Sequence, residues 1–255
     1  MKISLCIITL NEEANLPRCL ASSAGLVEEI VIVDSGSTDR TEHIARQYGA
    51  HWVPHAWLGY VGQKNLALSL AGSPWVMSLD ADEALSPRLA EEIRALKTGE
   101  PPPAVAGYDM PRCVYYEGRW IRHGDWYPDR LVRLFRKERA RFVGGQVHER
   151  LEVEGEVRHL QGDLYHYSFK DAADHRARGE HYARLWAESQ RAAGRTAGPL
   201  APYYHAAFRW LRGYLLRAGF LDGPQGWRIA ALCARETFLK YQMLRKLARS
   251  GRDQF

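Results

Sequence analysis

The chain has 255 residues, 46% of them hydrophobic and 25% charged, with a formal net charge of +5 at pH 7. This composition excludes a disordered or fibrous protein, and the length accommodates one α/β domain or one domain with an appendage. The four cysteines (Cys6, Cys19, Cys113 and Cys233) form no C-x-x-C pair, so we expect no disulfide framework, no zinc knuckle and a reducing compartment.

The two ends of the chain differ in character. At the N-terminus, the polar Asn11-Glu12-Glu13 follows a short apolar run where a signal peptide would carry its cleavage site. No stretch approaches 18 uncharged apolar residues, so no transmembrane helix is expected. Residues 201–255 contain eight Arg and two Lys against three acidic residues, a net charge of +7. Such a basic tail indicates a nucleic acid, an anionic membrane or an anionic acceptor as partner.

Short apolar runs alternate with helical patterns over the first hundred residues. The predicted strands are residues 3–10, 29–34, 51–55 and 75–80. The predicted helices lie around residues 16–20, 38–48, 62–71 and 86–98. Thr38 is expected to cap the second helix, and Ser86 followed by Pro87 is expected to begin the fourth. This alternation predicts an α/β fold with a parallel sheet and helices on both faces.

The pattern changes after the Gly- and Pro-rich segment at 99–107, which marks an internal boundary. Short alternating strands are predicted from Tyr108 to Ser168. Beyond Asp171 the periodicity predicts three helices, at residues 172–193, 201–218 and 226–249.

Polar clusters follow the strands of the first half or begin its helices. They are Thr9-Leu10-Asn11-Glu12-Glu13, Asp34-Ser35-Gly36-Ser37-Thr38-Asp39, Gly62-Gln63-Lys64-Asn65 and Asp80-Ala81-Asp82. Ligands of open parallel sheets bind outside the carboxyl ends of the strands. One polar strand end is usually only solvated, but four in succession predict a binding site.

Asp80, Asp82 and Glu83 follow an apolar strand within four positions, although neighbouring carboxylates repel one another. A hard divalent cation removes that repulsion, because it takes oxygen ligands from one or two carboxylates and from substrate phosphates. The alternative to a cation site is an acid cluster that caps the helix beginning after Ser86.

Together these motifs resemble glycosyltransferase family 2, whose members have the GT-A fold and use nucleotide-sugars. The matching segments are SLCIITLNEEANLPRCLAS, EEIVIVDSGSTDRT, GQKNLAL and WVMSLDADE, over about residues 1–100. Further along, PDRLVRLFRKERARFVGGQVHERL, LYHYS and GFLDGPQGWRIA resemble a narrower branch of short bacterial enzymes that add a hexose to the inner core of lipopolysaccharide. The resemblance implies a Rossmann-like, mostly parallel sheet with flanking helices and a C-terminal helical extension.

The same resemblance implies a division of labour along the chain. Residues 1–170 would form the catalytic domain, with a nucleotide-sugar half at 1–100 and an acceptor half at 101–170. Residues 171–255 would form the helical extension, which possesses the composition for membrane association.

The resemblance also implies a donor site for a nucleotide-sugar, with UDP-glucose as the expected donor. Thr9, Asn11 and Glu12 would border the base and ribose, and Asp34 would accept a hydrogen bond from the uracil ring. Lys64 either neutralises phosphate or is a surface lysine. Asp39 either caps its own helix or contacts the ligand. The remaining donor-site candidates are Gly36, Asn65, Asp80 and Ala81.

A Mg²⁺ or Mn²⁺ ion is implied as cofactor. Asp82 would bind it directly, and Asp80 would lie nearer the ribose or a metal-bound water. His148 and His166 are candidates for a further ligand, with an ordinary hydrogen-bonded structural role as the alternative.

An inverting transfer in one displacement also requires a base near the acceptor hydroxyl. Glu149 is the first candidate, and the preceding Gly144-Gly145 pair allows close backbone approach to a ligand. Many relatives use an Asp of an E-D pair, which this region lacks. Asp125 and Asp129 therefore stay as alternatives, as does a plain salt bridge between Glu149 and an arginine.

Aromatic side chains accompany both the second half and the tail. Tyr115, Trp120, Trp126 and Tyr127 predict a sugar-stacking platform or, equally, core packing. In FRWLRGYLLRAGF, aromatic residues mix with Arg209, Arg212 and Arg217, which is typical of a helix at an anionic membrane surface. A helix packed on the catalytic domain is the alternative, and nucleic acid is not expected as a partner.

These observations predict a metal-dependent, inverting glycosyltransferase that moves a hexose to a lipopolysaccharide-core or other lipid-linked saccharide. We expect it in the cytoplasm, peripheral on the cytoplasmic face of the inner membrane. The alternative is a membrane-associated nucleotide-sugar-binding protein without transferase activity. An NAD-dependent oxidoreductase is disfavoured, because no G-x-G-x-x-G follows the first strand. A phosphatase with a D-x-D nucleophile is disfavoured too, since no Thr follows soon after the acid motif.

Overall fold

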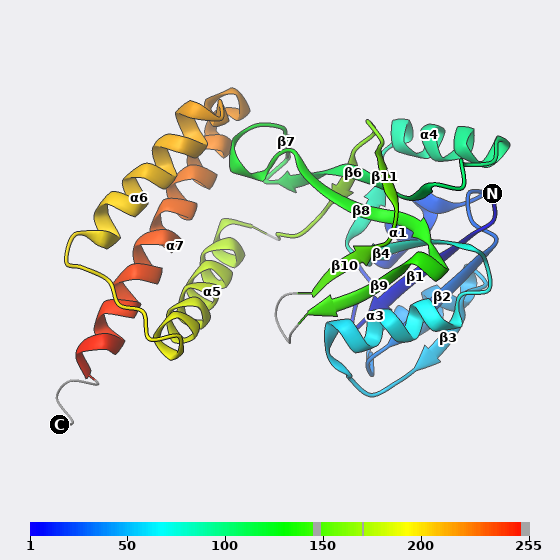
Figure 1. Cartoon of the computed structure of the whole chain (residues 1–255), viewed down its shortest axis with the longest axis horizontal. Helices are drawn as coiled ribbons and strands as arrows, with labels where there is room; N and C mark the ends of the chain where they lie inside the picture. Colours follow the sequence, from blue (N-terminus) through cyan, green and yellow to red (C-terminus); the bar gives the residue numbers. More distant parts are fainter. Residues whose placement is uncertain (145–148, 170, 251–255) are drawn as a thin grey trace. The chain divides into compact units, whose positions relative to one another are not determined.

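A computed structural model describes residues 1–144, 149–169 and 171–250 of the chain (Figure 1). The chain forms two compact units. The sheet unit consists of Met1–Arg112 and Asp129–Tyr167, and the helical unit consists of Cys113–Pro128 and the chain from Ser168 onward. The expected α/β fold with a C-terminal helical extension is confirmed.

Four parallel strands form one half of the main sheet. They are β1 (Ile3–Thr9), β2 (Glu29–Asp34), β3 (His51–Pro54) and β4 (Trp75–Asp80), in the order β3-β2-β1-β4. All four lie within one or two residues of their predicted positions. Near-continuous apolar runs such as Ile3–Ile8 form these strands because both faces of a parallel sheet are covered.

The sheet continues with mixed strand directions in the order β4-β8-β6-β12-β5. These strands are β5 (Glu83–Leu85), β6 (Val105–Tyr116), β8 (Asp129–Arg136) and β12 (Leu164–His166). Strand β11 (Glu156–His159) pairs with β6, while β9 (Ala140–Gly144) and β10 (Glu149–Val153) form a separate antiparallel ribbon.

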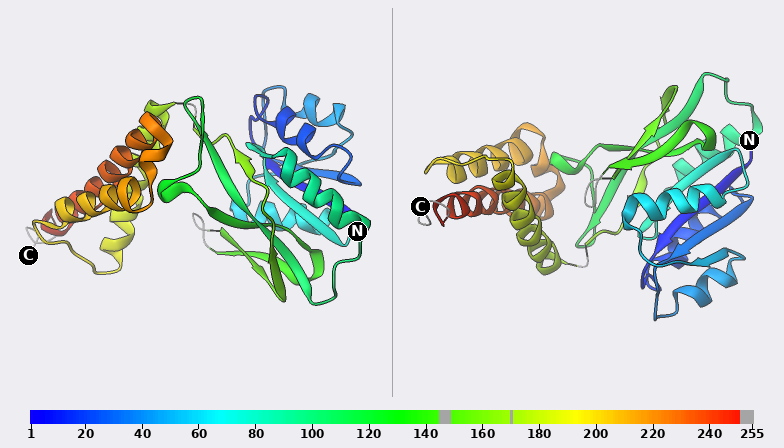
Figure 2. Two further views of the ribbon diagram at one scale, coloured as in Figure 1. Left: turned by 90° about the horizontal axis from the view of Figure 1, so that it is seen from above. Right: turned by 60° about the horizontal axis from the view of Figure 1, so that its bottom comes forward.

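Helices cover both faces of the parallel half, as predicted (Figure 2). They are α1 (Leu16–Ser23), α2 (Thr41–Gln47), α3 (Gly59–Leu70) and α4 (Pro87–Thr98). Successive side chains of a strand point to opposite faces of the sheet, so one strand contributes to two hydrophobic cores. In β1, Leu5 and Ile7 join the core under α1 and α4, and Cys6 joins the core under α3.

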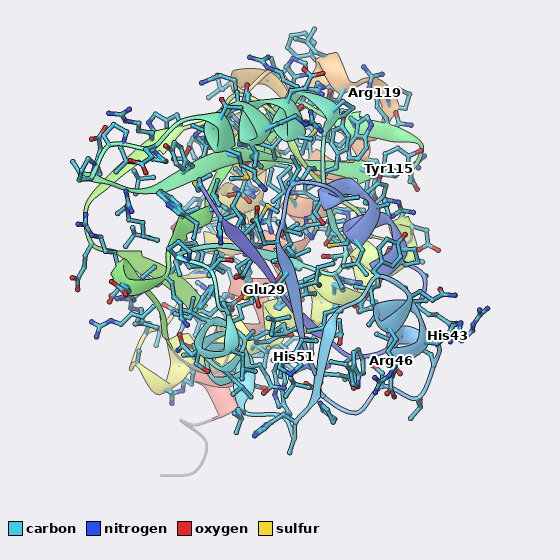
Figure 3. The ribbon with its side chains drawn as sticks, turned by 90° about the vertical axis from the view of Figure 1, so that its right-hand side faces the viewer. Glu29, His43, Arg46, His51, Tyr115 and Arg119 are labelled. Carbon is cyan, nitrogen blue, oxygen red and sulfur yellow. The ribbon has the colours of Figure 1, made fainter. Side chains whose placement is uncertain are left out.

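The first residues of α4 and α2 test two predictions of helix capping. Helix α4 begins as predicted, because the Ser86 hydroxyl accepts a hydrogen bond from the Leu89 amide at 3.2 Å. The prediction that Thr38 caps α2 is wrong. The Thr38 amide instead donates to Asn11 Oδ1 at 2.8 Å, and α2 begins at Thr41, whose amide donates to Asp39 at 3.0 Å. Figure 3 shows the exposed outer side of this helix at His43 and Arg46.

The helical unit combines three long helices with a segment from the middle of the chain. Its elements are β7 (Arg119–Ile121), α5 (Ala172–Ala192), α6 (Ala201–Leu211), a π-helical turn (Arg212–Leu216), a 3₁₀ turn (Gly219–Asp222) and α7 (Gly223–Ser250). Tyr116 and Ile121 pack against Ile229 and Cys233 in its core. The predicted division at residue 170 stays a prediction, but the segment 113–128 packs with the helices that follow it.

None of the helices in the described part of the chain is long and apolar enough to cross a bilayer.

Candidate active site

The carboxyl ends of β1, β2 and β4 meet at one edge of the sheet. Thr9 pairs in register with Asp34, and Ile8 pairs with Asp80. Three of the polar clusters singled out in the sequence therefore lie side by side, which is where open parallel sheets bind ligands.

Asp34 organises the loop after β2. Its buried carboxylate accepts hydrogen bonds from the Thr9 hydroxyl at 2.9 Å, the Gly36 amide at 2.8 Å and the Ser37 amide at 2.7 Å, and from the Ser37 hydroxyl at 2.5 Å. Gly36 has a φ of +99°, which favours glycine. These contacts place the Asp34 carboxylate inside its own turn, so its predicted contact with a uracil ring stays a prediction.

Asn11 fastens the β1 loop to the β2 loop. The backbone N–H of Asn11 donates to the Ser37 hydroxyl at 2.7 Å, and the side-chain oxygen of Asn11 accepts from the Thr38 backbone amide. Asn11 adopts a left-handed φ of 56°, a conformation that Asn tolerates better than most residues. The two loops thus form one polar rim beside the strand ends.

Acidic side chains crowd this rim. Burial raises the pKa of Glu12, and the negative charges of Asp82, Asp39 and Asp80 raise it further, while a hydrogen bond from Asn15 opposes the shift. A cation placed among these carboxylates would relieve their repulsion.

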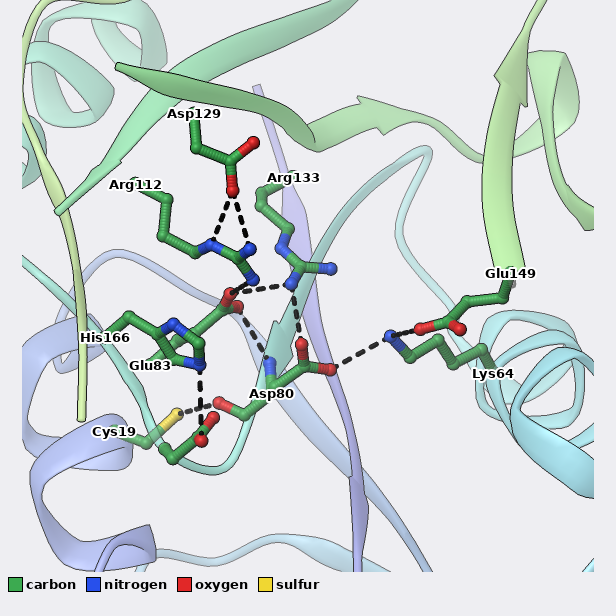
Figure 4. A network of polar contacts seen from close by, with 10 residues as sticks. Cys19, Lys64, Asp80, Glu83, Arg112, Asp129, Arg133, Glu149 and His166 are labelled. Carbon is green, nitrogen blue, oxygen red and sulfur yellow. Dashed lines mark hydrogen bonds and ion pairs between the residues drawn. The ribbon is translucent and has the colours of Figure 1, made fainter. Parts of the chain in front are cut away.

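Asp80 is neutralised on both carboxylate oxygens (Figure 4). Lys64 Nζ lies 2.9 Å from Oδ1, and Arg133 Nη2 lies 2.6 Å from Oδ2. Burial alone would raise the pKa of Asp80, but the charges of Arg133 and Lys64 outweigh burial and hold it well below its ordinary value. Asp80 therefore remains ionised without a metal.

Arg133 and Glu83 complete a buried ion cluster that the sequence did not reveal. Arg133 Nη2 lies 2.6 Å from Glu83 Oε1, and the Asp80 amide donates to Glu83 Oε2 at 3.0 Å. Burial and the Asp80 charge raise the pKa of Glu83, against the opposing charge of Arg133. The sequence signal for this cluster is an arginine between Val132 and Leu134 within a strand, because a buried charge needs a partner of opposite charge.

Asp82 and His166 form the second polar pair of the acid motif. His166 Nε2 lies 3.3 Å from Asp82 Oδ2, and the Tyr167 amide donates to the Asp82 carbonyl. His166 comes from β12, which pairs with β5 so that His166 faces Glu83 in register. His148, the other predicted histidine ligand, lies outside the described residues.

The donor set of this pair fits a divalent cation. Among the described residues, no group of three or more His, Cys, Asp and Glu side chains could hold a metal. One carboxylate and one imidazole suffice, however, when substrate phosphates and waters supply the remaining ligands.

Lys64 connects the acid edge to the predicted base. The Lys64 ammonium is 3.3 Å from Glu149 Oε1, at the start of β10. The neighbouring Asn65 holds this ribbon in place, since its side chain exchanges two hydrogen bonds with the Phe142 backbone, at 2.9 and 3.0 Å. Asn65 thus has a structural role here, and Ala81 is buried beside the acid pair.

The other base candidates bind arginines. In the sheet unit, Asp129 lies 2.6 Å from Arg112. In the helical unit, the buried Asp125 lies 2.9 Å from Arg209, and 3.5 and 3.4 Å from Arg212 and Arg217. These three arginines, for which the sequence predicts either an anionic lipid surface or a packed helix as partner, converge on one carboxylate, and their contact with lipid stays a prediction.

The predicted aromatic platform consists of packing contacts in the helical unit. Tyr115 meets Trp120 edge-on at 5.0 Å, and Trp126 stacks on Phe169 at 5.2 Å. These contacts agree with the packing alternative, and the sugar-stacking role stays a prediction.

Comparisons with known proteins show the family of the chain. The family model described as "Glycosyl transferase family 2" matches residues 4–151. The lipopolysaccharide core biosynthesis glycosyltransferase LpsC of Rhizobium meliloti is 30% identical over 257 residues, which cover 95% of this chain and 94% of LpsC. An uncharacterized glycosyltransferase of Rickettsia typhi is 29% identical, over 99% of this chain and 89% of its own length.

A crystal structure of residues 1–349 of S. aureus TarS in complex with UDP superimposes with a TM-score of 0.48 at 14% identity, covering 98% of this chain and 92% of that chain. The family model covers more than half of the chain, and the similarity to LpsC extends over nearly all of it. The chain is therefore a glycosyltransferase that belongs to family 2.

Proposed function

We propose that this enzyme is a metal-dependent, inverting hexosyltransferase that uses a UDP-sugar, with UDP-glucose as the first candidate. The observation that carries the proposal is the convergence of Asp80, Lys64 and Glu149 at the edge where Asp82 meets His166. Donor-binding acids and a candidate base thereby share one site, as a single displacement requires.

Each residue then has a chemical task. Asp82 and His166 would hold a Mg²⁺ or Mn²⁺ ion, which neutralises charge on the leaving diphosphate when bound. Lys64 contributes a further positive charge at the same edge. Glu149 would accept the proton of the acceptor hydroxyl at its carboxylate, and Arg133 fixes the orientation of Asp80.

The acceptor proposed is a lipopolysaccharide-core or other lipid-linked saccharide. The similarity to LpsC over almost the whole chain supports this class. The enzyme would then work in the cytoplasm, at the cytoplasmic face of the inner membrane.

We propose that the helical unit contacts that membrane through an apolar stripe rather than through the three arginines around Asp125. The stripe is an exposed face of α6 and the turns that bracket it, formed by Leu200, Tyr204, Phe208, Leu211 and Leu215. Their spacing of three or four residues places them on one side of the helix. The net charge of +7 over residues 201–255 favours an anionic lipid surface as the occupant.

The proposed reaction is tested with purified protein and a panel of nucleotide-sugars. Mn²⁺-dependent release of nucleotide diphosphate, and transfer of radiolabelled hexose to lipopolysaccharide lacking outer sugars, are the expected results. An enzyme that uses none of the UDP-hexoses, or that works fully in EDTA, contradicts the proposal.

A further inference from the structure

A cavity of about 440 Å³ opens beside the contact between Lys64, Asp80 and Glu149. It lies within the sheet unit, between β8 and the β9–β10 ribbon. Its lining is strongly basic, with Asp80 and Glu149 as acids against five cationic side chains. The cationic lining residues are Lys64, Arg112, Arg130, Arg133 and Arg150.

Carboxylates outside the lining hold two of these arginines in place. Arg130 lies 2.6 Å from Asp109, and Arg150 Nη2 lies 2.7 Å from Glu152. A guanidinium group carries five N–H donors in a planar fork, of which one carboxylate takes at most two. Arg130 also donates from Nη2 to the backbone carbonyls of Asp109 and Leu160. The two arginines are thus held by contacts outside the cavity, and the donors that these contacts leave over are available to a ligand.

Arg133 is the least exposed of the four lining arginines. Its side chain is 9% exposed, and Nη2 contacts both Asp80 and Glu83. Its Nε is buried and has no hydrogen-bond partner among the described residues. Because Nε is shielded from solvent, a molecule in the cavity does not reach it in this conformation and would contact other atoms of the guanidinium.

We propose that the cavity binds an acidic group of the saccharide acceptor, either a phosphate or a carboxylate near the accepting hydroxyl. The inference rests on the proposed function, because Glu149 as base brings the acceptor to this cavity. The donor diphosphate is expected at Asp82 and His166, which do not line the cavity, while the donor-site candidates Asp80 and Lys64 line the part that borders the donor site. Arginine forks match the geometry of both oxyanions, and their remaining N–H donors bind a charged acceptor more strongly than a neutral hydroxyl.

The chain offers a matched pair of variants for the test. Arg150 and Arg141 both pair with Glu152 on the ribbon and are about equally exposed, at 70% and 71%. Only Arg150 lines the cavity. Arg150→Gln and Arg141→Gln thus remove the same charge and the same kind of ion pair, and differ in their position relative to the proposed ligand.

The experiment titrates glucose 6-phosphate, glucuronate and methyl glucoside into the full chain by calorimetry, with and without UDP and Mn²⁺. The two charged probes are expected to bind together with UDP, and the tighter of them identifies phosphate or carboxylate as the source. Loss of one charge-assisted contact in Arg150→Gln should raise their Kd roughly tenfold. Arg141→Gln should leave the Kd unchanged, and thermal unfolding checks that both variants are folded.

Three results overturn the proposal: methyl glucoside binds as tightly as the charged probes, UDP displaces the charged probes, or both variants lose affinity equally. Should Arg150→Gln not fold, Arg130→Gln replaces it. Its control is Arg139→Gln, because Arg139 donates to the Pro103 carbonyl and does not line the cavity. Failure of the proposed function has a different signature. In that case UDP and Mn²⁺ do not bind or donor is not turned over, while the titrations without UDP still report on the cavity.

Discussion

The Lys64 ammonium lies 3.3 Å from the Glu149 carboxylate, although 85 positions separate the two residues in the chain. Lys64 is nearly fully buried in α3 and also contacts Asp80 at 2.9 Å. One cation therefore connects the acid edge of the sheet to the start of the β9–β10 ribbon. Asp125 pairs with three arginines of the helical unit, whereas Asp129 pairs with Arg112, which also lies 3.8 Å from Glu83 and lines the same cavity as Glu149. Contact with Lys64 therefore favours Glu149, and Asp129 is the nearer of its two rivals.

Glu149→Gln is expected to lower the turnover rate by roughly 10²–10⁴, the usual contribution of a general base. Donor affinity should change little, because the base faces the acceptor. Steady-state kinetics and calorimetry with UDP separate the two quantities. Glu154→Gln, at an exposed position just after the same strand, is the control, and turnover of Glu149→Gln at the control's rate would exclude Glu149 as the base.

Asp82→Asn and His166→Asn are each expected to weaken Mn²⁺-dependent binding of UDP, since each removes one of the two proposed protein ligands. Binding of Mn²⁺ can be followed by its paramagnetic effect on water relaxation, independently of turnover. Glu91→Gln, at an exposed position of α4, is the control. Unchanged Mn²⁺ affinity in both variants would show that the cation binds elsewhere.

Arg133→Met is expected to destabilise the sheet unit by about 3–5 kcal/mol, because it leaves Glu83 buried without its main counter-charge. The double variant Arg133→Met/Glu83→Leu should recover much of this loss, since no uncompensated charge then remains in that position. Urea unfolding measures both. A loss below about 1 kcal/mol, the range of exposed ion pairs, would mean that the cluster is solvated.

The helical unit is expected to lose stability on mild acidification. Burial lowers the pKa of His175, against the charges of Glu236 and Asp174, and its Nδ1 lies 3.2 Å from the Tyr116 hydroxyl. As the pH falls through about 6.5, His175 therefore becomes protonated in the unfolded chain but stays neutral in the folded chain. Stability should fall as pH drops below about 6.5 and level off below the folded-state pKa.

Unfolding free energies measured between pH 8 and pH 5 test this dependence. His175→Gln should flatten it, while His181→Gln, at an exposed position of α5, should not. A slope that persists in His175→Gln would assign it to another group.

Phe208→Ser/Leu215→Ser is expected to weaken sedimentation of the protein with anionic vesicles at low salt, because the apolar stripe loses two of its large side chains. High salt should release the unmodified protein, since screening shortens the reach of its basic charges. Trp57→Ser removes a comparably exposed residue of the sheet unit and serves as control. Equal vesicle binding by all three proteins would rule out the stripe as the contact surface.

Local sequence signals predicted most of the fold. The Ser86-Pro87 start and Gly99 end of α4 were predictable because capping depends on a few neighbouring residues. The prediction that Thr38 caps a helix was wrong because a distant contact decides its conformation: its amide donates to Asn11, 27 positions away. The apolar run before Asp80 predicted that this residue ends a strand. Its pairing with Arg133, 53 positions away, depends on which strands become neighbours in the sheet. Sequence periodicity does not determine that neighbourhood.

The segment Cys113–Pro128 leaves the sheet unit and returns to it, so the chain passes between the two units three times. A fragment ending at residue 170, which the sequence suggests as a self-contained catalytic piece, would keep Tyr116 and Ile121 but lose Ile229 and Cys233, against which they pack. Asp125 would likewise be stripped of its three arginines. Expression of the sheet unit alone therefore calls for replacing residues 113–128 with a short linker, not for a stop codon after the last strand.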